Sequence, residues 1–235
     1  LAGVIVNNEG SQTLQINPAK LKKAQFPNDL TEKLRASVLL IAPMVARLGY
    51  VKMGFPGGDI IGRRPLDTHF QVLEELGAKV KKGDDFFEIT ASKLQGAEIF
   101  LQEASVTATE NAIIAACTAE GTTTIKRAAS EPHVVDLCQF LVKMGAEIDG
   151  IGSNILKING RKSLSGARHS VRPDHIEVGT FAILAAITSS KLEISPIVEE
   201  DLDMILLTLK KFGVKYQIKD KKLTIEPSKL VAVEK

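Results

Sequence analysis

The residues with the clearest chemical potential lie in one loop, residues 54–69. Its four glycines and two prolines exclude a regular helix or a central strand. The loop carries an isolated carboxylate, Asp59, then the paired Arg63 and Arg64, and then Pro65, which can occupy the first turn of a helix. Backbone that can approach a ligand closely, beside cations and a helix N-terminus, favours an anion. We interpret the loop as an anion site, with a solvent-exposed connection as the alternative.

Composition limits the partners that this chain can have. The 235 residues carry a net charge of +2 at pH 7, with 5% aromatic residues and no tryptophan. A balanced charge and few aromatic rings argue against a surface that binds nucleic acid. No apolar run approaches the ~20 residues of a membrane helix, and the first residues lack the pattern of a signal peptide. We therefore expect neither nucleic acid nor a membrane as a partner.

The cysteines and histidines indicate no metal site. Cys117 and Cys138 lie in apolar helical patterns without CxxC spacing, and the four histidines are scattered. Such cysteines are typical of small buried side chains in a reducing compartment. Zinc sites require groups of these residues at characteristic spacings. We therefore expect a cytoplasmic protein that uses no metal.

One pattern recurs three times along the chain. A helical segment ends at Gly77, at Gly145 and at Gly213, and both intervals between these glycines are 68 residues. A fixed interval indicates a repeated supersecondary unit. Each unit is predicted to contain an apolar helix, a β-branched strand, a second helix that the glycine ends, and a hairpin. The first helices are expected at 34–48, 108–119 and 176–187, the second helices at 66–76, 134–144 and 202–212, and the hairpins at 78–90, 146–159 and 214–226.

The N-terminal segment, residues 1–17, has the pattern of a closing hairpin without the helices that precede it in the other units. The chain is thus predicted to be an α/β (α+β) protein of about three βαβαββ units and one orphan hairpin. Because repeat units bury their apolar faces against neighbours, one interpretation is a larger parent protein that is truncated at both ends. The alternative is that the orphan hairpin caps the array.

Five motifs connect this organisation to a known family. They are Leu-Arg-Ala-Ser at 34–37, the loop at 54–69, Glu-Gly-Thr-Thr at 120–123, Ala-Ser-Glu-Pro at 129–132 and Pro-Asp-His-Ile-Glu-x-Gly-Thr-Phe at 173–181. In this order, and together with the repeat, they resemble the enolpyruvyl transferases. The loop and its Arg-Pro-Leu-Asp at 64–67 resemble the branch that acts on UDP-N-acetylglucosamine more than the shikimate-pathway branch.

The resemblance implies an inside-out α/β barrel fold with two domains of three units each, which close over the substrates. Residues 1–171 would form most of one domain. Residues 172–235 would form the crossover and the first unit of the second domain, whose remainder would be absent. An active site assembled from both domains would then be incomplete, so we expect negligible turnover from the isolated chain.

The resemblance also implies a reaction. Family members transfer the enolpyruvyl group of phosphoenolpyruvate to the 3-hydroxyl of UDP-N-acetylglucosamine and release phosphate. The reaction passes through a tetrahedral intermediate and needs neither a metal nor an organic cofactor. It is the first committed step of peptidoglycan synthesis, and therefore serves cell-wall growth, cell shape and division.

Site residues follow from the matched motifs. Asp59 would be catalytic, since it stands where the family commonly has a cysteine that takes part in proton transfer or product release. Arg35 would bind phosphate, residues 64–67 would hold the uridine nucleotide, and Ser105 and Val106 would face its diphosphate. The substrate-binding positions are Arg35, Arg64, Pro65, Leu66, Asp67, Ser105 and Val106. Ser105 taken alone is typical of a helix N-cap.

Several positions depart from the family pattern. A carboxylate at Asp59 can exchange protons, but it traps an epoxide less readily than a thiolate, so we expect insensitivity to fosfomycin. Thr107 replaces a glycine, Glu103 replaces a lysine and His175 replaces an arginine. His69 matches a family histidine, and its residue type alone suggests a structural role.

Two alternatives to this function stay open. The first is a degenerate, non-catalytic paralogue that binds a nucleotide sugar or a protein partner, which the substitutions at Thr107 and Glu103 favour. The second is an enolpyruvyl transferase of the shikimate pathway. Competition between UDP-N-acetylglucosamine and shikimate 3-phosphate would separate the two enzymes.

Overall fold

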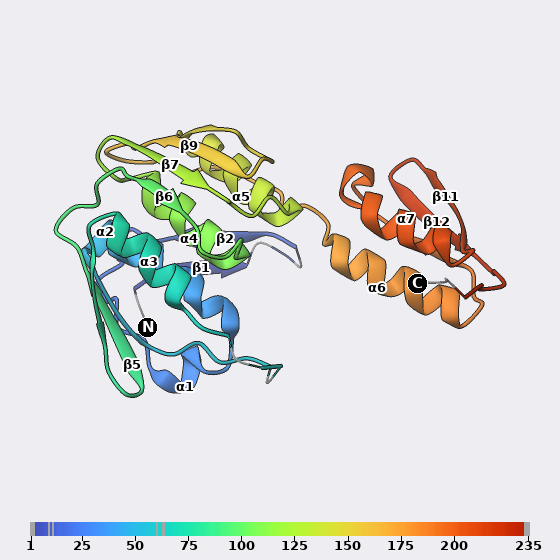
Figure 1. Ribbon diagram of the computed structural model, residues 1–235, viewed down its shortest axis with the longest axis horizontal. Coiled ribbons are helices and arrows are strands. Elements are labelled where there is room, and N and C mark those ends of the chain that lie inside the picture. The colour runs from blue at the N-terminus through green and yellow to red at the C-terminus, as the bar shows by residue number, and fades with distance from the viewer. Residues whose placement is uncertain (1–2, 9, 11, 60, 63, 233–235) are drawn as a thin grey trace. The chain divides into compact units, whose positions relative to one another are not determined.

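The computed structural model describes residues 3–8, 10, 12–59, 61–62 and 64–232. The chain divides into two compact units, residues 1–168 and residues 169–235 (Figure 1). The division lies close to the one expected after residue 171. That these units correspond to two family domains stays a prediction.

The first unit holds a hairpin and two repeats. In the hairpin, β1 (Ile5–Asn8) pairs antiparallel with β2 (Leu14–Asn17), as the sequence predicted. The first repeat contains α1 (Asn28–Thr31), the 3-10 helix η1 (Arg35–Leu40), α2 (Ile41–Leu48), β3 (Tyr50–Gly54), α3 (Asp67–Glu75), β4 (Lys79–Lys82) and β5 (Phe86–Thr90). The second contains β6 (Glu98–Phe100), α4 (Val106–Ala116), β7 (Thr122–Lys126), α5 (Pro132–Lys143), β8 (Glu147–Asp149) and β9 (Ile155–Asn159).

The second unit holds the third repeat. It contains α6 (His175–Ile187), β10 (Leu192–Ile194), the 3-10 helix η2 (Glu199–Asp201), α7 (Asp203–Lys211), β11 (Lys215–Lys219) and β12 (Lys222–Glu226). Asp174 caps α6 by accepting hydrogen bonds from the backbone N–H groups of Ile176 at 2.8 Å and Glu177 at 3.3 Å. A helix start marked by such a carboxylate is stabilised by the helix dipole.

The three repeats share one antiparallel sheet pattern, so the predicted α/β fold of repeated units is confirmed. The sheet orders are β3-β5-β4, β6-β7-β9-β8 and β10-β12-β11, and in each the last strand of the repeat lies between two others. Gly77, Gly145 and Gly213 follow the second helices with φ of +91°, +100° and +77°. These left-handed residues end the helices and start the hairpins, as the spacing predicted.

The repeats differ in their first strand. In the second repeat β6 pairs parallel with β7. In the first repeat the same role falls to an isolated parallel bridge between Gln25 and Lys52. Within the described part of the second unit, no strand precedes α6.

Helix α4 is the centre of the first unit. It packs against η1, α2, α3 and α5 and against strands β7 and β9 (Figure 1). Its alanines at 108, 112, 115 and 116 are buried, and their small side chains allow neighbouring helices to approach closely. Two polar residues of α4, Thr109 and Asn111, are also fully buried. Because buried polar groups need hydrogen-bond partners, these two residues fix how α4 meets its neighbours.

The helix expected over residues 34–48 is divided in the structure. Residues 35–40 form the 3-10 helix η1, and α2 starts only at Ile41. Pro43 accounts for the division, because a proline lacks a backbone N–H and its ring clashes with the carbonyl four residues earlier. In a helix that started at residue 35, the Pro43 ring would clash with the carbonyl four residues earlier in the same helix. With α2 starting at Ile41, Pro43 lies in the first turn, where it is tolerated.

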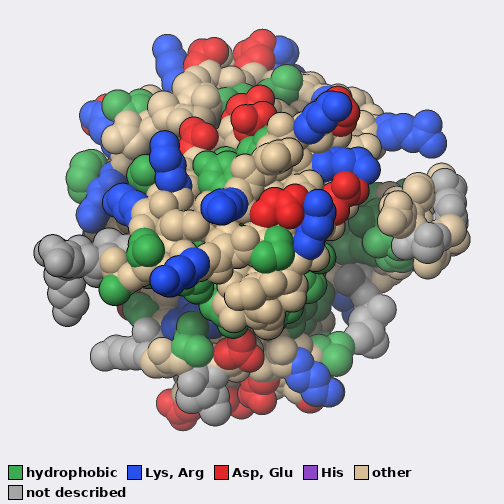
Figure 2. Space-filling model, turned by 90° about the vertical axis from the view of Figure 1, so that its right-hand side faces the viewer, with side chains coloured by type: hydrophobic (Ala, Val, Ile, Leu, Met, Phe, Trp, Pro, Cys, Tyr) green, Lys and Arg blue, Asp and Glu red, His purple; other side chains and the backbone are tan. Residues whose placement is uncertain are grey.

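The described residues contain no helix whose length and apolar character would let it cross a membrane. On the face shown in Figure 2, Lys and Arg side chains are interspersed with Asp and Glu. A surface of mixed charge on this face does not provide the continuous positive stripe that binds nucleic acid.

Buried Glu110 of α4 gives the first unit a pH-dependent stability. Burial, and then the charge of Glu131, raise the pKa of Glu110 from 4.5 to about 7. The unfolded chain has the ordinary value, so the folded chain holds this proton more tightly. The free energy of unfolding should therefore fall as the pH rises from about 4.5 to about 7.

We expect Glu110→Gln to remove most of this fall. The gain in stability at pH 8 should be at most about 2 kcal/mol, because partial solvent screening reduces the cost of the charge. Urea unfolding at pH 5 and pH 8 measures it. Exposed Glu74, replaced by Gln, is the matched control and should leave the pH profile unchanged. If the free energy of unfolding of Glu110→Gln depended on pH as that of the wild type does, Glu110 would not be its cause.

Candidate functional site

Five residues predicted to bind substrate line one cavity of the first unit. Its volume is about 290 Å³. Arg35 thereby comes next to residues 64–67, although Arg35 and Arg64 are 29 positions apart in the sequence. Among the described residues, the lining consists of Arg35, Phe55, Pro56, Arg64, Pro65, Leu66, Asp67, Phe70 and Lys82.

Arg35, the first residue of η1, joins the two ends of the loop. Its Nη1 donates to the Pro56 carbonyl at 3.3 Å, and its Nη2 donates to the carbonyls of Arg64 at 2.9 Å and Pro65 at 3.4 Å. Burial, and then the charge of Arg64, lower the pKa of Arg35 from its ordinary value. An arginine nevertheless stays protonated at neutral pH. The anchored guanidinium of Arg35 and the nearby charge of Arg64 together favour a bound anion.

Part of the cavity wall is aromatic. The rings of Phe55 and Phe70 contact the buried ring of Phe87, with centroid distances of 5.6 Å and 5.2 Å. Lys82 places its Nζ 4.7 Å from the Phe70 centroid and 3.4 Å from Asp67 Oδ1. The cavity thus offers ring faces beside charged groups, which suits a ligand that has both a planar ring and an anionic part.

The glycines of the loop hold it against the preceding segment. The backbone N–H of Gly57 donates to the Thr31 carbonyl at 3.2 Å, and that of Gly58 donates to the Glu32 carbonyl at 3.1 Å. A Cβ on Gly57 would lie 1.8 Å from the Glu32 carbonyl oxygen, so only glycine permits this approach. The first half of the loop is therefore docked beside the start of η1.

Asp59 follows this docked part, and its side chain is exposed. It is not among the described residues that line the cavity. Its neighbours Ile60 and Arg63 lie outside the described residues. The catalytic role of Asp59 stays a prediction.

Ser105 and Val106 lie at the start of α4. The Ser105 side chain accepts a hydrogen bond from the Ala108 N–H at 3.4 Å, which confirms the N-cap expected from its residue type. Val106 is the first residue of the helix. Neither residue lines the cavity among the described residues. Their contact with a diphosphate stays a prediction.

A buried polar network next to the cavity was missed by the sequence reasoning. His69 places Nε2 3.1 Å from Thr107 Oγ1 and Nδ1 3.0 Å from Asn111 Nδ2. Asn111 Oδ1 accepts from the Ala42 N–H at 3.0 Å. Burial, and then the charge of Arg35, lower the pKa of His69 from 6.5 to about 4. The sequence analysis singled out His69 and Thr107 but not Asn111, an asparagine within an apolar helix, and it gave no indication that the three residues are partners.

Comparison with known proteins identifies the family. The family model described as EPSP synthase (3-phosphoshikimate 1-carboxyvinyltransferase) matches residues 1–234. The chain belongs to this EPSP synthase family. The expected resemblance to enolpyruvyl transferases is thereby confirmed.

Curated members of the family show substantial identity. The chain is 50% identical over 206 residues to a UDP-N-acetylglucosamine 1-carboxyvinyltransferase of Treponema denticola, covering 88% of this chain and 48% of the relative. It is 45% identical over 222 residues to the protein of the same name from Bradyrhizobium diazoefficiens, covering 94% and 51%. The chain thus spans about half the length of the curated relatives that it matches.

Solved structures of the family share the fold. The enolpyruvyl transferase NikO from Streptomyces tendae matches with a TM-score of 0.83 at 22% identity, covering 96% of this chain and 55% of that one. EPSP synthase from Acinetobacter baumannii matches with a TM-score of 0.71 at 21% identity, covering 97% and 55%. At these identities the likeness supports the fold.

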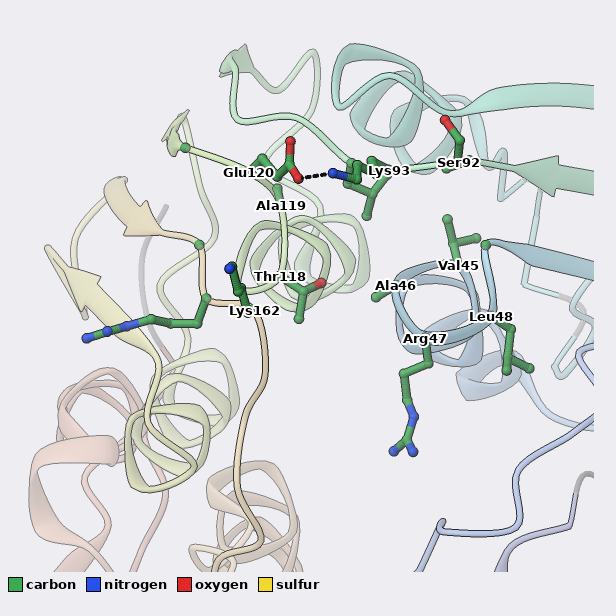
Figure 3. Close-up of a pocket in the computed structure, with 16 residues that line it drawn as sticks. Val45, Ala46, Arg47, Leu48, Ser92, Lys93, Thr118, Ala119, Glu120 and Lys162 are labelled. Atoms are coloured by element: carbon green, nitrogen blue, oxygen red, sulfur yellow. Dashed lines mark hydrogen bonds and ion pairs between the residues drawn. The ribbon is translucent and has the colours of Figure 1, made fainter.

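A larger cavity of about 870 Å³ lies at the C-terminal ends of α2 and α4, away from the residues that match the family's substrate positions. Figure 3 shows α2 residues on one side of it and Lys162 with Thr118 on another. Lys93 Nζ pairs with Glu120 Oε1 at 2.5 Å there. Helix C-termini carry partial negative charge, which nearby cations complement and which disfavours an anion. We therefore place the candidate site of this family member at the smaller cavity.

Gly57→Ala should undock the loop. The added Cβ would meet the Glu32 carbonyl, so we expect a loss of about 1–3 kcal/mol of stability or a displaced loop. Chemical denaturation and proteolytic cleavage of residues 54–66 measure the two effects. Gly166→Ala is the matched control, because a Cβ at Gly166 has no described atom within 4 Å. Equal behaviour of the two variants would contradict the docking.

Proposed function

We propose that this protein transfers the enolpyruvyl group of phosphoenolpyruvate to the 3-hydroxyl of UDP-N-acetylglucosamine. The single observation that carries the proposal is the convergence of Arg35 with residues 64–67 on one cavity. Relatives named UDP-N-acetylglucosamine 1-carboxyvinyltransferase, at 42–50% identity, support the choice of acceptor. The reaction is the first committed step of peptidoglycan synthesis, so the protein would serve cell-wall growth, cell shape and division.

The geometry of the cavity supports roles for its residues. The guanidinium groups of Arg35 and Arg64 would attract the phosphate groups of the substrates. The aromatic wall formed by Phe55 and Phe70 would face an apolar or planar part of the nucleotide sugar. Asp67 begins α3 beside this wall and carries acceptor oxygens for ring or ribose donors.

The chemistry needs proton transfer at a carbon atom. The sugar hydroxyl gives up its proton to a base and its oxygen bonds to C2 of phosphoenolpyruvate, while the C2–C3 double bond opens and C3 gains a proton. Loss of a C3 proton and of phosphate then restores the double bond and leaves the enol ether. Asp59 is proposed to exchange the C3 proton, because a carboxyl can both give and accept one. Its place on an exposed loop agrees with a group that approaches the substrate when the loop moves.

Two other functions compete with this proposal. The description of the family model names the shikimate-pathway enzyme, and titration with shikimate 3-phosphate against UDP-N-acetylglucosamine tests it. A non-catalytic paralogue was favoured by Thr107 and Glu103. The Thr107 hydroxyl, however, lies 3.1 Å from His69 Nε2, so its side chain has a partner on α3. Mass spectrometry of the product formed by the full-length gene product separates an enzyme from a binding protein.

A cytoplasmic location is part of the proposal. Both cysteines are free and buried. Burial, and then the electrostatic effect of Cys138, raise the pKa of Cys117 to about 12. Unreactive thiols of this kind agree with a reducing compartment, in which the nucleotide sugar is also expected.

Arg35→Lys should weaken binding of UDP-N-acetylglucosamine by about tenfold or more. A lysine keeps the charge but loses the planar fork that reaches both the loop carbonyls and an anion. Isothermal titration calorimetry on the chain measures the dissociation constant, with the melting temperature checked in parallel. Arg47→Lys, at the larger cavity, is the control and should bind as the wild type does. Equal affinities of the wild type and Arg35→Lys would count against the site.

Asp59 should make the enzyme insensitive to fosfomycin. We expect full-length wild type to keep its activity after prolonged incubation with the epoxide, because a carboxylate is a weak nucleophile toward it. Asp59→Cys should gain time-dependent inactivation, which single-turnover or residual-activity assays follow. Time-dependent inactivation of the wild type would refute this expectation.

A further inference from the structure

The side-chain amide of Asn111 has one possible orientation. Its Oδ1 accepts from the Ala42 N–H at 3.0 Å, and its Nδ2 donates to the Val38 carbonyl at 3.1 Å. Both partners are backbone groups whose donor and acceptor roles cannot change. In a continuous helix Ala42 N–H would bond to the Val38 carbonyl. The Asn111 amide therefore takes the place of one helical hydrogen bond at the junction of η1 and α2.

This orientation determines the state of His69. The second hydrogen of Asn111 Nδ2 points to His69 Nδ1 at 3.0 Å, so Nδ1 must be an acceptor. The proton of the neutral ring then lies on Nε2, which donates to Thr107 Oγ1 at 3.1 Å. Burial of His69 and the nearby Arg35 also favour the neutral ring. The three side chains thus form a directed chain of hydrogen bonds from Asn111 through His69 to Thr107.

These hydrogen bonds connect two parts of the proposed site. His69 lies in the first turn of α3, two residues after Asp67, which lines the cavity. Thr107 lies in the first turn of α4, directly after Ser105 and Val106. Asn111, one turn further along α4, anchors the network to the backbone of the η1–α2 junction. The hydrogen bond between His69 Nε2 and Thr107 Oγ1 therefore joins the start of α3 to the start of α4.

We propose that His69 and Thr107 are positioning residues, which hold the start of α4 at a fixed distance from the start of α3 so that one nucleotide-sugar diphosphate can contact both. This inference rests on the proposed function. Glycine at position 107, the residue that other family members were expected to have, offers no acceptor to His69 Nε2. Thr107 would therefore be a specificity-determining residue of this chain.

The hydrogen-bond chain can be tested without any ligand. In a chain labelled with ¹⁵N, two-bond nitrogen–proton correlation spectra should show Nε2 of His69 protonated and Nδ1 unprotonated at pH 7. Thr107→Val should shift the Nε2 signal, and Thr107→Ser should restore it. A His69 ring protonated on Nδ1 would overturn the proposed network.

The positioning role is tested by binding. Thr107→Val should lower the affinity for UDP-N-acetylglucosamine by about tenfold, the scale of one lost hydrogen bond. The same variant should bind UMP, which lacks the second phosphate and the amino sugar, within twofold of the wild type. Thr107→Ser should restore affinity for the nucleotide sugar to within twofold. Thr118→Val, which changes a threonine two residues beyond the last residue of α4, is the matched control and should bind as the wild type does.

Kinetics of the full-length gene product provide a second readout. Thr107→Val should raise KM for UDP-N-acetylglucosamine about tenfold and leave KM for phosphoenolpyruvate within twofold. Unchanged affinity for UDP-N-acetylglucosamine in Thr107→Val, or equal losses for both substrates, would overturn the positioning role alone. A wild type that binds no UDP-N-acetylglucosamine would instead overturn the proposed function together with it.

Discussion

One side-chain amide, that of Asn111, supports the arrangement on which the candidate site depends. Pro43 forces a break between η1 and α2, and at the break the Val38 carbonyl accepts from the Ile41 N–H, which leaves the Ala42 N–H without its helical acceptor. Asn111 Oδ1 satisfies the Ala42 N–H from the centre of α4, and Asn111 Nδ2 is a second donor to the Val38 carbonyl. Because an unpaired buried donor or acceptor costs about 1–3 kcal/mol, the amide is strongly constrained. Arg35, at the start of η1, is thereby held at a fixed place relative to α4.

The electrostatic character of the cavity is set by side chains whose protonation states stay the same at neutral pH. Arg35 is anchored by three carbonyl groups, and its pKa, though lowered, leaves it cationic at neutral pH. His69 behind it stays neutral, because its Nδ1 already accepts a hydrogen bond. A second cation at that position would add repulsion without binding energy. The arrangement therefore presents positive charge toward the cavity and a neutral, hydrogen-bonded network on its inner side.

Much of the fold could be predicted from the sequence, and the reason is periodicity. The glycines at 77, 145 and 213 need left-handed backbone, so their spacing marks the same turn in each repeat. Arg35 and residues 64–67 were brought together by family resemblance, and the cavity agrees with that grouping. The partners of Asn111 could not be predicted, because they depend on contacts between residues that are distant in the sequence. The division at Ile41 was not expected from the apolar pattern, although its cause, Pro43, is local.

The network also explains how a substitution in a turn can be accommodated. Thr107 stands where the family pattern has a glycine, so it adds a side chain in the first turn of α4. In the structure the Thr107 hydroxyl lies at hydrogen-bond distance from His69, whose other nitrogen is held by Asn111. The Thr107 side chain thus gives the Nε2–H of His69 an acceptor, which a glycine at position 107 would not provide. Thr107, His69 and Asn111 form one unit, so their effects on binding should be strongly non-additive.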